Sequence, residues 1–169
     1  MAGKGKQFEK AFKDSLPKEY VYYRLKDAPK DFNNPNPNIR FTPSNIADCI
    51  IGNPYTGKMH FVELKETVNS SLPFGNINFD HAEKIQLVER FGFCEGYLLV
   101  RFSDKRTGTF ALKISKLLEF REQQKVSEKP KKSFSFDWIV ENGIAVPERL
   151  IVTNYRLDVT KVFGKGSDF

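Results

Sequence analysis

The sequence has little cysteine and little histidine, with two of each in 169 residues. Cys49 and Cys94 lie in apolar, strand-like stretches, and no paired cysteine and histidine spacing typical of a zinc site occurs. The sequence therefore argues against a structural disulfide and against a zinc centre. It predicts two buried free thiols and a reducing, intracellular location.

Long apolar runs are absent too. No run approaches the roughly 18 apolar residues of a membrane span, and the first six residues, MAGKGK, lack the apolar core of a signal peptide. We therefore expect no membrane partner and a cytoplasmic protein. At this length the chain is most simply one domain, 1–169, large enough to bury a real core.

The charges are unbalanced, with 27 Lys and Arg against 21 Asp and Glu, a net charge of +6 and a pI near 9.2. This excess favours a polyanionic partner such as DNA, although many basic proteins bind none. The basic residues are spread along the chain, so a solvated surface explains them nearly as well as contacts with a DNA backbone. The groups concerned are Lys4, Lys6, Lys10 and Lys13, then Arg101, Lys105 and Arg106, and finally Lys129, Lys131 and Lys132.

Apolar periodicity and turn-forming residues divide the chain into a series of elements. Helical spacing predicts helices at 7–16, 80–91 and 116–124, with Pro17 ending the first, Asp80 capping the second and Ser115 capping the third. Aromatic, β-branched or apolar stretches predict strands at 20–25, 46–51, 60–66, 94–102 and 109–114. The loops include an asparagine- and proline-rich stretch at 27–43, a polar loop at 67–78 and a charged stretch at 125–133 that we expect to be exposed. This order indicates a mixed α/β domain with one central β-sheet flanked by helices.

Two neighbouring predicted strands carry the residues with the clearest chemistry. Asp48 lies on the strand at 46–51, and the next strand carries Glu63 and Lys65. Because side chains alternate along a strand, Glu63 and Lys65 point to one side while Val62 and Leu64 point to the other. A hairpin can place Asp48 beside them. Two carboxylates and an ammonium in one place form a site for a hard divalent cation and a phosphate, which is the chemistry of phosphodiester hydrolysis.

Structural roles are the alternative for the same three residues. An unpaired carboxylate in an apolar strand is costly to bury, so Asp48 and Glu63 need either a cation or several hydrogen-bond donors. Lys65 is either a solvated strand lysine or a group that orients the attacking water and stabilises the developing phosphate charge.

The element order, with Asp48 followed by Glu63-x-Lys65, resembles the PD-(D/E)xK nuclease fold. The local sequence narrows this likeness. The segments 5–9 (GKQFE), 63–67 (ELKET) and 71–74 (SLPF), and the histidine-containing helix opened by residues 78–79 (NF), resemble the RecU-type Holliday junction resolvases of Gram-positive bacteria and their phages. The likeness covers roughly residues 3–114. The loop at 27–43 is the nearest equivalent of the projecting stalk of that family, and 125–169 is a carboxy-terminal extension that the likeness does not place.

The resemblance implies a restriction-endonuclease-like core and a metal-dependent, structure-selective endodeoxyribonuclease. Such an enzyme would bind branched DNA as a homodimer and resolve four-way junctions by paired symmetric nicks during recombination, in a bacterial cytoplasm and from a bacterial or a phage gene. Mg²⁺ or Mn²⁺ would bind Asp48, Glu63 and the backbone carbonyl of Leu64. Two alternatives remain, namely another PD-(D/E)xK nuclease that acts on linear or flap DNA, and a DNA-binding module with a silent site.

Further residues are candidates for the catalytic set or for DNA contacts. Glu9 and Gln86 are candidate catalytic residues, although glutamate and glutamine on a helix are ordinarily solvated. Small donors on the loop after the catalytic strand suit phosphate contacts, although loops of this composition are common. The expected DNA-contacting residues are Lys6, Arg40, Thr67, Asn69, Ser71 and His81.

Overall fold

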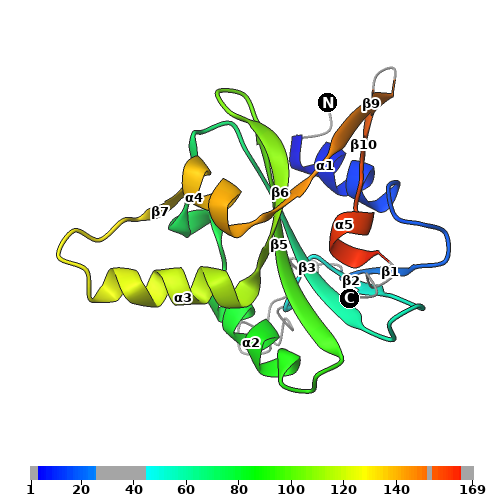
Figure 1. Ribbon diagram of the computed structural model, residues 1–169, viewed down its shortest axis with the longest axis horizontal. Helices are drawn as coiled ribbons and strands as arrows, with labels where there is room; N and C mark the ends of the chain where they lie inside the picture. Colours follow the sequence, from blue (N-terminus) through cyan, green and yellow to red (C-terminus); the bar gives the residue numbers. More distant parts are fainter. Residues whose placement is uncertain (1–3, 26–44, 152–153, 165–169) are drawn as a thin grey trace, which may run out of the picture.

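The computed structural model describes residues 4–25, 45–151 and 154–164. Figure 1 shows the elements along the chain. The helices are α1 (Lys4–Lys13), α2 (Phe79–Glu89), α3 (Ile114–Lys125), α4 (Phe136–Asn142) and α5 (Thr160–Phe163), with a 3-10 turn at Phe74–Asn76. The strands are β1 (Val21–Arg24), β2 (Cys49–Gly52), β3 (Met59–Thr67), β4 (Ser71–Pro73), β5 (Cys94–Ser103), β6 (Thr107–Lys113), β7 (Ser133–Ser135), β8 (Ile144–Val146), β9 (Glu148–Ile151) and β10 (Asn154–Leu157).

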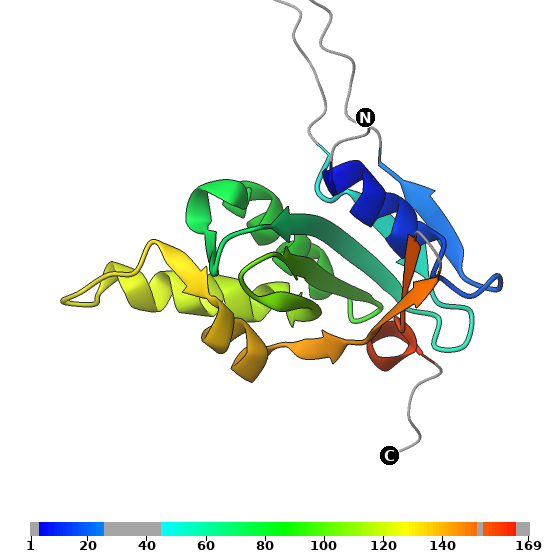
Figure 2. The ribbon, with the colours of Figure 1, turned by 90° about the horizontal axis from the view of Figure 1, so that it is seen from above.

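A central sheet of six strands organises the described residues, in the order β1-β2-β3-β5-β6-β8. β3 and β5 are parallel, and every other neighbouring pair in this sheet is antiparallel. The described residues also form two small antiparallel sheets, β9 with β10 and β4 with β7. The predicted mixed α/β architecture with one central sheet flanked by helices is therefore confirmed (Figure 2).

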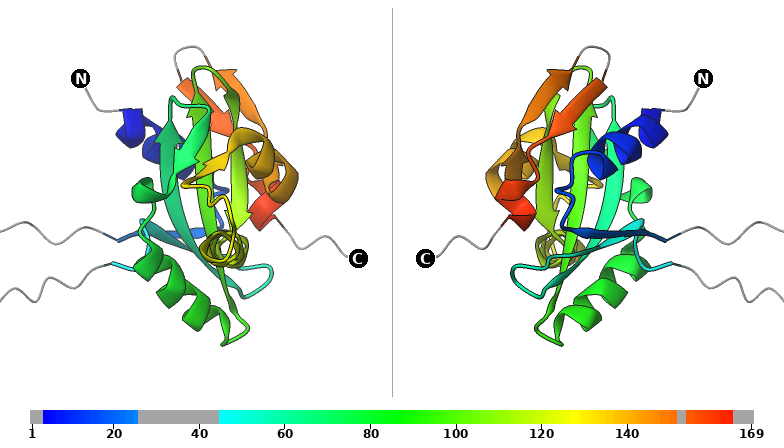
Figure 3. Two further views of the ribbon diagram at one scale, coloured as in Figure 1. Left: turned by 90° about the vertical axis from the view of Figure 1, so that its left-hand side faces the viewer. Right: turned by 90° about the vertical axis from the view of Figure 1, so that its right-hand side faces the viewer.

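Two apolar cores lie on the two sides of this sheet. One contains Phe61 and Leu98 from the sheet and receives Ile85 from α2 and Leu117 from α3. The other is built from alternate positions of the same strands and receives side chains from α1 and α5. Its members include Phe8, Phe12, Val62, Leu64, Leu99 and Phe163. Helices α2 and α3 therefore cover one face and α1 and α5 the other (Figure 3).

Several element boundaries differ from the prediction. Helix α1 ends at Lys13, three residues early, because the Ser15 hydroxyl donates to the Ala11 carbonyl (2.5 Å) while the chain turns. The cap of α2 is Asn78 rather than Asp80, since the Asn78 side chain accepts from the backbone N of His81. Ser115 lies inside α3 and does not cap it. That helix starts at the buried Ile114, directly where β6 ends.

The carboxy-terminal region, which the sequence left unplaced, completes both sides of the sheet. β7 pairs with β4, and β8 pairs with the edge of β6. Phe163 of α5 packs against Phe12 and Tyr97 in the second core, and its carbonyl accepts from Asn53 Nδ2 at 2.8 Å. Residues 125–132 are exposed, as predicted.

Two further predictions concern thiols and membranes. Cys49 and Cys94 are both buried and free, which confirms the expected pair of unlinked thiols. Over the ranges that the structure describes, the helices are too short or too polar for a bilayer crossing.

Candidate active site

The pairing of β2 with β3 places Asp48 beside the middle of β3. Cys49 pairs with Val62, and the backbone N of Asp48 donates to the Val62 carbonyl at 3.1 Å. The Asp48 side chain turns along β3, where Oδ2 accepts a hydrogen bond from the backbone N of Leu64 at 2.7 Å. Asp48 immediately precedes β2 rather than lying within it. The predicted proximity of Asp48 to the Glu63–Lys65 segment is confirmed.

Glu63 and Lys65 lie on the same face of β3 and form an ion pair. Lys65 Nζ is 2.7 Å from Glu63 Oε1, and the side chains are 28% and 12% exposed respectively. Val62 and Leu64 point into the opposite core, as the alternation predicted. The carboxylate and the ammonium are therefore partly withdrawn from water but still accessible to a ligand.

The charges of these residues perturb one another. Burial raises the pKa of Glu63, the negative charge of Asp48 raises it further, and Lys65 and His81 only partly oppose this. Burial alone would lower the pKa of Lys65, but the neighbouring carboxylates, Glu63 first, outweigh it and raise that pKa above its usual value. At neutral pH, Lys65 is therefore an ammonium bound to Glu63.

The donor set fits a hard divalent cation with few protein ligands. The negative charge of Asp48 disfavours ionisation of Glu63, so a cation between the two carboxylates would be stabilised. Oxygen donors are the preferred ligands of Mg²⁺, which usually keeps several waters and binds one or two carboxylates. Within the described ranges, no group of three or more His, Cys, Asp or Glu side chains gathers as a metal cluster. Among the described groups, the candidate ligands are thus the two carboxylates, and the Leu64 carbonyl stays a predicted third ligand.

Glu9 of α1, the helix that packs on the other face of the sheet, is engaged in an ion pair away from Asp48 and Glu63. Its Oε2 lies 2.7 Å from Arg24 Nη2, so it ties α1 to the edge strand β1. Its negative charge contributes to the raised pKa of Lys65, which places it within electrostatic range of the site. Lys6, on the same helix, is exposed.

Helix α2 presents His81, not Gln86, to the site. A small cavity brings together Glu63 and His81, with Ala82, Ile85 and Leu98 among its apolar walls. Gln86 is exposed and makes no described contact with the site. The sequence held the signal for this orientation: the apolar residues Ala82 and Ile85 define the buried face of the helix, and His81 lies at its edge.

The residues expected to donate to phosphates on the loop after β3 differ in how exposed they are. Thr67 is 5% exposed, and its hydroxyl accepts from the backbone N of Asn69 at 3.1 Å, so it shapes the loop. Asn69 is exposed and Ser71 is half-buried at the start of β4. Arg40, with the whole loop at 27–43, lies outside the described residues.

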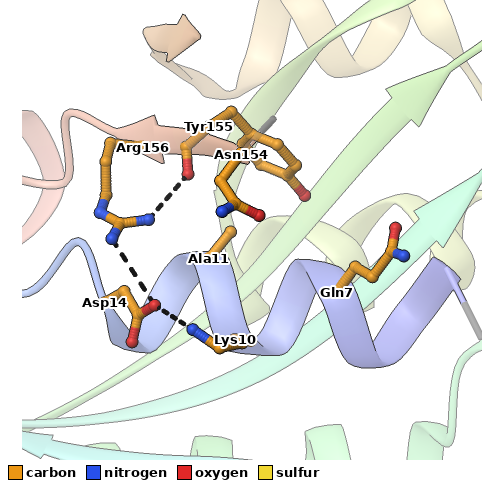
Figure 4. Close-up of a pocket in the computed structure, with 7 residues that line it drawn as sticks. All are labelled: Gln7, Lys10, Ala11, Asp14, Asn154, Tyr155 and Arg156. Carbon is orange, nitrogen blue, oxygen red and sulfur yellow. Dashed lines mark hydrogen bonds and ion pairs between the residues drawn. The ribbon is translucent and has the colours of Figure 1, made fainter. Parts of the chain in front are cut away.

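A separate polar pocket of about 130 Å³ lies between α1 and β10 (Figure 4). Its charged residues satisfy one another: Asp14 is 2.6 Å from Lys10 Nζ and 3.6 Å from Arg156 Nη2. None of the predicted catalytic residues lines it. The ion pairs around this pocket therefore join the carboxy-terminal hairpin to α1, and the pocket is distinct from the Asp48–Glu63 site.

Residues 50–162 match the family described as RecU, Recombination protein U. This segment is more than half of the 169-residue chain. The chain belongs to this family.

Membership in the RecU family confirms the resemblance drawn from the sequence and makes the protein a Holliday junction-resolving nuclease. The match includes Glu63, Lys65 and His81 and begins two residues after Asp48. It also runs to residue 162, well beyond residue 114, where the sequence-based likeness ended.

Solved structures similar to this chain include a Holliday junction resolvase. The Holliday junction resolvase Hjc from the archaeal hyperthermophile Archaeoglobus fulgidus, solved at 1.6 Å, has 16% sequence identity and a TM-score of 0.49, over 83% of this chain and 95% of that chain. No curated protein matches the sequence significantly.

Proposed function

We propose that this protein is a metal-dependent, structure-selective endodeoxyribonuclease that cuts four-way DNA junctions with paired symmetric nicks. One observation carries the proposal. In a chain of the RecU family, the β2–β3 pairing brings the Asp48 carboxylate to the strand that carries the Glu63–Lys65 ion pair. This arrangement offers two anionic ligands and one cationic donor on the accessible part of the sheet.

Asp48 and Glu63 would hold Mg²⁺ or Mn²⁺, with the Leu64 carbonyl as a third ligand. The bound cation would supply Lewis-acid stabilisation of phosphate charge and a lower pKa for an attacking water. The hydrogen bond from the Leu64 N fixes the direction of the Asp48 carboxylate before any ligand arrives. This preorganisation reduces the reorganisation that binding and reaction require.

Lys65 would stabilise the negative charge that develops on the phosphate in the transition state. Its ammonium faces the same side as Glu63 and is only partly exposed, so its charge is less screened than that of a surface lysine. Glu9 would not bind the cation directly but would act on the site electrostatically, held in place by its ion pair with Arg24. Gln86 stays a predicted catalytic residue. The predicted DNA contacts are Lys6, Arg40, Thr67, Asn69, Ser71 and His81.

Paired symmetric nicks require two active sites, and we propose a homodimer on a two-fold axis that matches the symmetry of the junction. Exposed apolar side chains at the end of α2 support an interface. Leu87, Phe91 and Phe93 are 54%, 68% and 51% exposed, and the two phenylalanine rings lie 6.1 Å apart. Apolar surface of this kind on a soluble fold marks interaction sites.

The test is cleavage of end-labelled four-way junction, linear duplex and flap DNA in Mg²⁺, by wild type and by the variants Asp48→Asn, Glu63→Gln and Lys65→Met. We expect symmetric nicks in the junction, and their loss in all three variants while junction binding in Ca²⁺ persists. Asp104→Asn, a change at an exposed turn, serves as the control and should cleave normally.

Other results would change the proposal. Equal cleavage of all three DNA forms would favour a nuclease for linear or flap DNA. Binding without cleavage under any divalent metal would favour a silent DNA-binding module. Loss of binding together with loss of circular dichroism in the variants would make the three residues structural.

A further inference from the structure

The loop that joins α3 to β7 extends from one end of the molecule (Figures 1 and 2). The buried residues of α3 are Ile114, Leu117, Leu118 and Phe120, so its last turn carries no core side chain. Residues 125–132, which follow, are all exposed, and Val126 is 88% exposed. We call this segment, residues 125–132, the lysine loop. No apolar packing of its own side chains accounts for its projecting position.

The lysine loop carries positive charge that the rest of the described chain does not neutralise. Lys125 pairs with Glu122 at 2.6 Å, whereas Lys129, Lys131 and Lys132 make no ion pair with any described residue. The one acidic residue between positions 125 and 133 is Glu128. Three free ammonium groups within four residues form a local excess of cationic charge.

The backbone of the lysine loop is held in place. The backbone N of Lys131 donates to Gln124 Oε1 at 3.0 Å, and the carbonyl of Lys132 accepts from the backbone N of Phe74 at 3.0 Å. Pro130 directly precedes these two anchored residues and removes further backbone freedom. The three lysines therefore start from a fixed backbone, which lowers the entropy that a partner must overcome.

The anchor of the loop is continuous with the catalytic strand. The loop leads into β7, which pairs with β4, and β4 begins four residues after the end of β3. Leu72 of β4 and Phe134 of β7 belong to the core on the side of the sheet that carries Glu63 and Lys65. The lysine loop is thus attached to the same face as the candidate active site, at a distance along the molecule from it.

We propose that Lys129, Lys131 and Lys132 bind the phosphate backbone of a duplex arm of the DNA whose strand lies at Asp48 and Glu63. The inference rests on the proposed nuclease function. Adjacent unpaired ammonium groups complement closely spaced phosphates, and the loop sequence, KVSEKPKK, has no aromatic or amide side chain that would read bases. The contact is independent of sequence and lengthens the footprint along the arm.

The test uses the full chain with Lys129, Lys131 and Lys132 all changed to Gln. The matched control changes Lys18, Lys116 and Lys161 to Gln, which removes the same charge from exposed, dispersed positions. Junction affinity is measured by fluorescence anisotropy in Ca²⁺ across a salt series. Each lost phosphate contact reduces the slope of log K against log salt by about 0.9, so the loop variant should lose roughly 2 to 3 in slope and the control less than about 1.

A second measurement locates the contact. Shortening the junction arms stepwise should weaken wild-type binding at the length where the lysine loop loses its phosphates, and the loop variant should show no such step. Equal salt slopes for the loop variant and the control would overturn the inference. So would a loss of affinity at the same arm length in wild type and in the loop variant. Equal thermal stability of the variants and wild type excludes misfolding as the cause. A loop variant that loses affinity for an acidic protein but not for DNA would also refute the inference.

Wild-type cleavage separates the two proposals. Metal-dependent nicking of the junction with an unchanged slope in the loop variant refutes the lysine loop alone. A changed slope without any nicking by wild type refutes the nuclease and leaves the DNA contact standing.

Discussion

At Gly96 on β5, side chains of α2 and α3 pack directly against the central sheet, so replacing it with Ala is a direct test of how the site is built. A Cβ at Gly96 would overlap Ile85 Cγ2 and would lie 2.9 Å from Ile114 Cγ1. Ile85 and Ile114 are 1% and 2% exposed, so neither side chain can move into solvent. His81 lies one turn before Ile85 on α2, so a displaced helix also moves His81 relative to Glu63.

The expected magnitude follows from the overlap. Adding one methyl group to a close-packed interior typically costs about 1–3 kcal/mol, and the clash with Ile85 places Gly96→Ala in that range. Ile85→Ala alone should cost about 2–5 kcal/mol through the cavity that it leaves. In the double variant the new methyl group occupies part of that cavity, so its loss of stability should be smaller than the sum by about 0.5–3 kcal/mol.

Urea unfolding followed by circular dichroism measures all three variants, and junction cleavage is measured in parallel. Gly75→Ala is the control, because a Cβ there meets no heavy atom within 4 Å. It should change stability by no more than about 0.5 kcal/mol. Additive free energies in the Gly96 and Ile85 cycle would refute the close packing of α2 on β5. A destabilised but fully active Gly96→Ala would refute the link to the site.

Three further outcomes follow from the structure. Arg101→Met should destabilise the fold by about 3 kcal/mol, because it removes the partner 2.8 Å from the buried Glu66 carboxylate, and adding Glu66→Leu should recover most of the loss in urea unfolding. Burial lowers the pKa of His60 to about 4, and hydrogen bonds from lysines, despite burial, lower the pKa of Glu95 to about 2. The unfolded chain therefore binds more protons than the folded one in these pH ranges, so the free energy of unfolding should fall as the pH drops. The decline should run from about pH 6.5 to 4 for His60 and from about pH 4.5 to 2 for Glu95. The variant His60→Phe should remove the first decline and leave the second. Phe91→Asp should convert a dimer into a monomer in light scattering, whereas an unchanged mass would remove this surface from the interface.

Sequence patterns predicted α1, α2, α3 and the strands β1, β2, β3, β5 and β6 because their signals are local. They missed β4 and the 3-10 turn, which lie inside the expected loop at 67–78. Phe8 and Phe12 recur at helical spacing, and both are buried under α1. The alternation around Glu63 and Lys65 fixed which face of β3 carries charge, and the hairpin brought Asp48 to that strand. These features depend on short-range periodicity, which a single sequence displays.

The remainder depends on contacts between distant residues. Strands β7 and β8 have three residues each, too few for a period, and their pairing with β4 and β6 defines them. Asn78 and Asp80 are both good cap residues, so the start of α2 was ambiguous by composition alone. That ambiguity carried over to the site: the rotation of α2, which presents His81 rather than Gln86, is set by the packing of Ile85 over Gly96.

The position of the candidate site follows from where the apolar core ends along β3. Phe61 is buried beneath α2, and the next two residues on that face are Glu63 and Lys65. Glu63 lies beside Leu98, its register partner on β5, in a cavity with mostly apolar walls, and these surroundings make its charge costly to hold without a partner. Lys65 provides that partner in the structure. In the proposed reaction, a cation shared by the Asp48 and Glu63 carboxylates would take over this neutralising role. The Lys65 ammonium would then be available to a phosphate oxygen. The same lysine would therefore stabilise the fold before DNA binds and the charge on the phosphate afterwards.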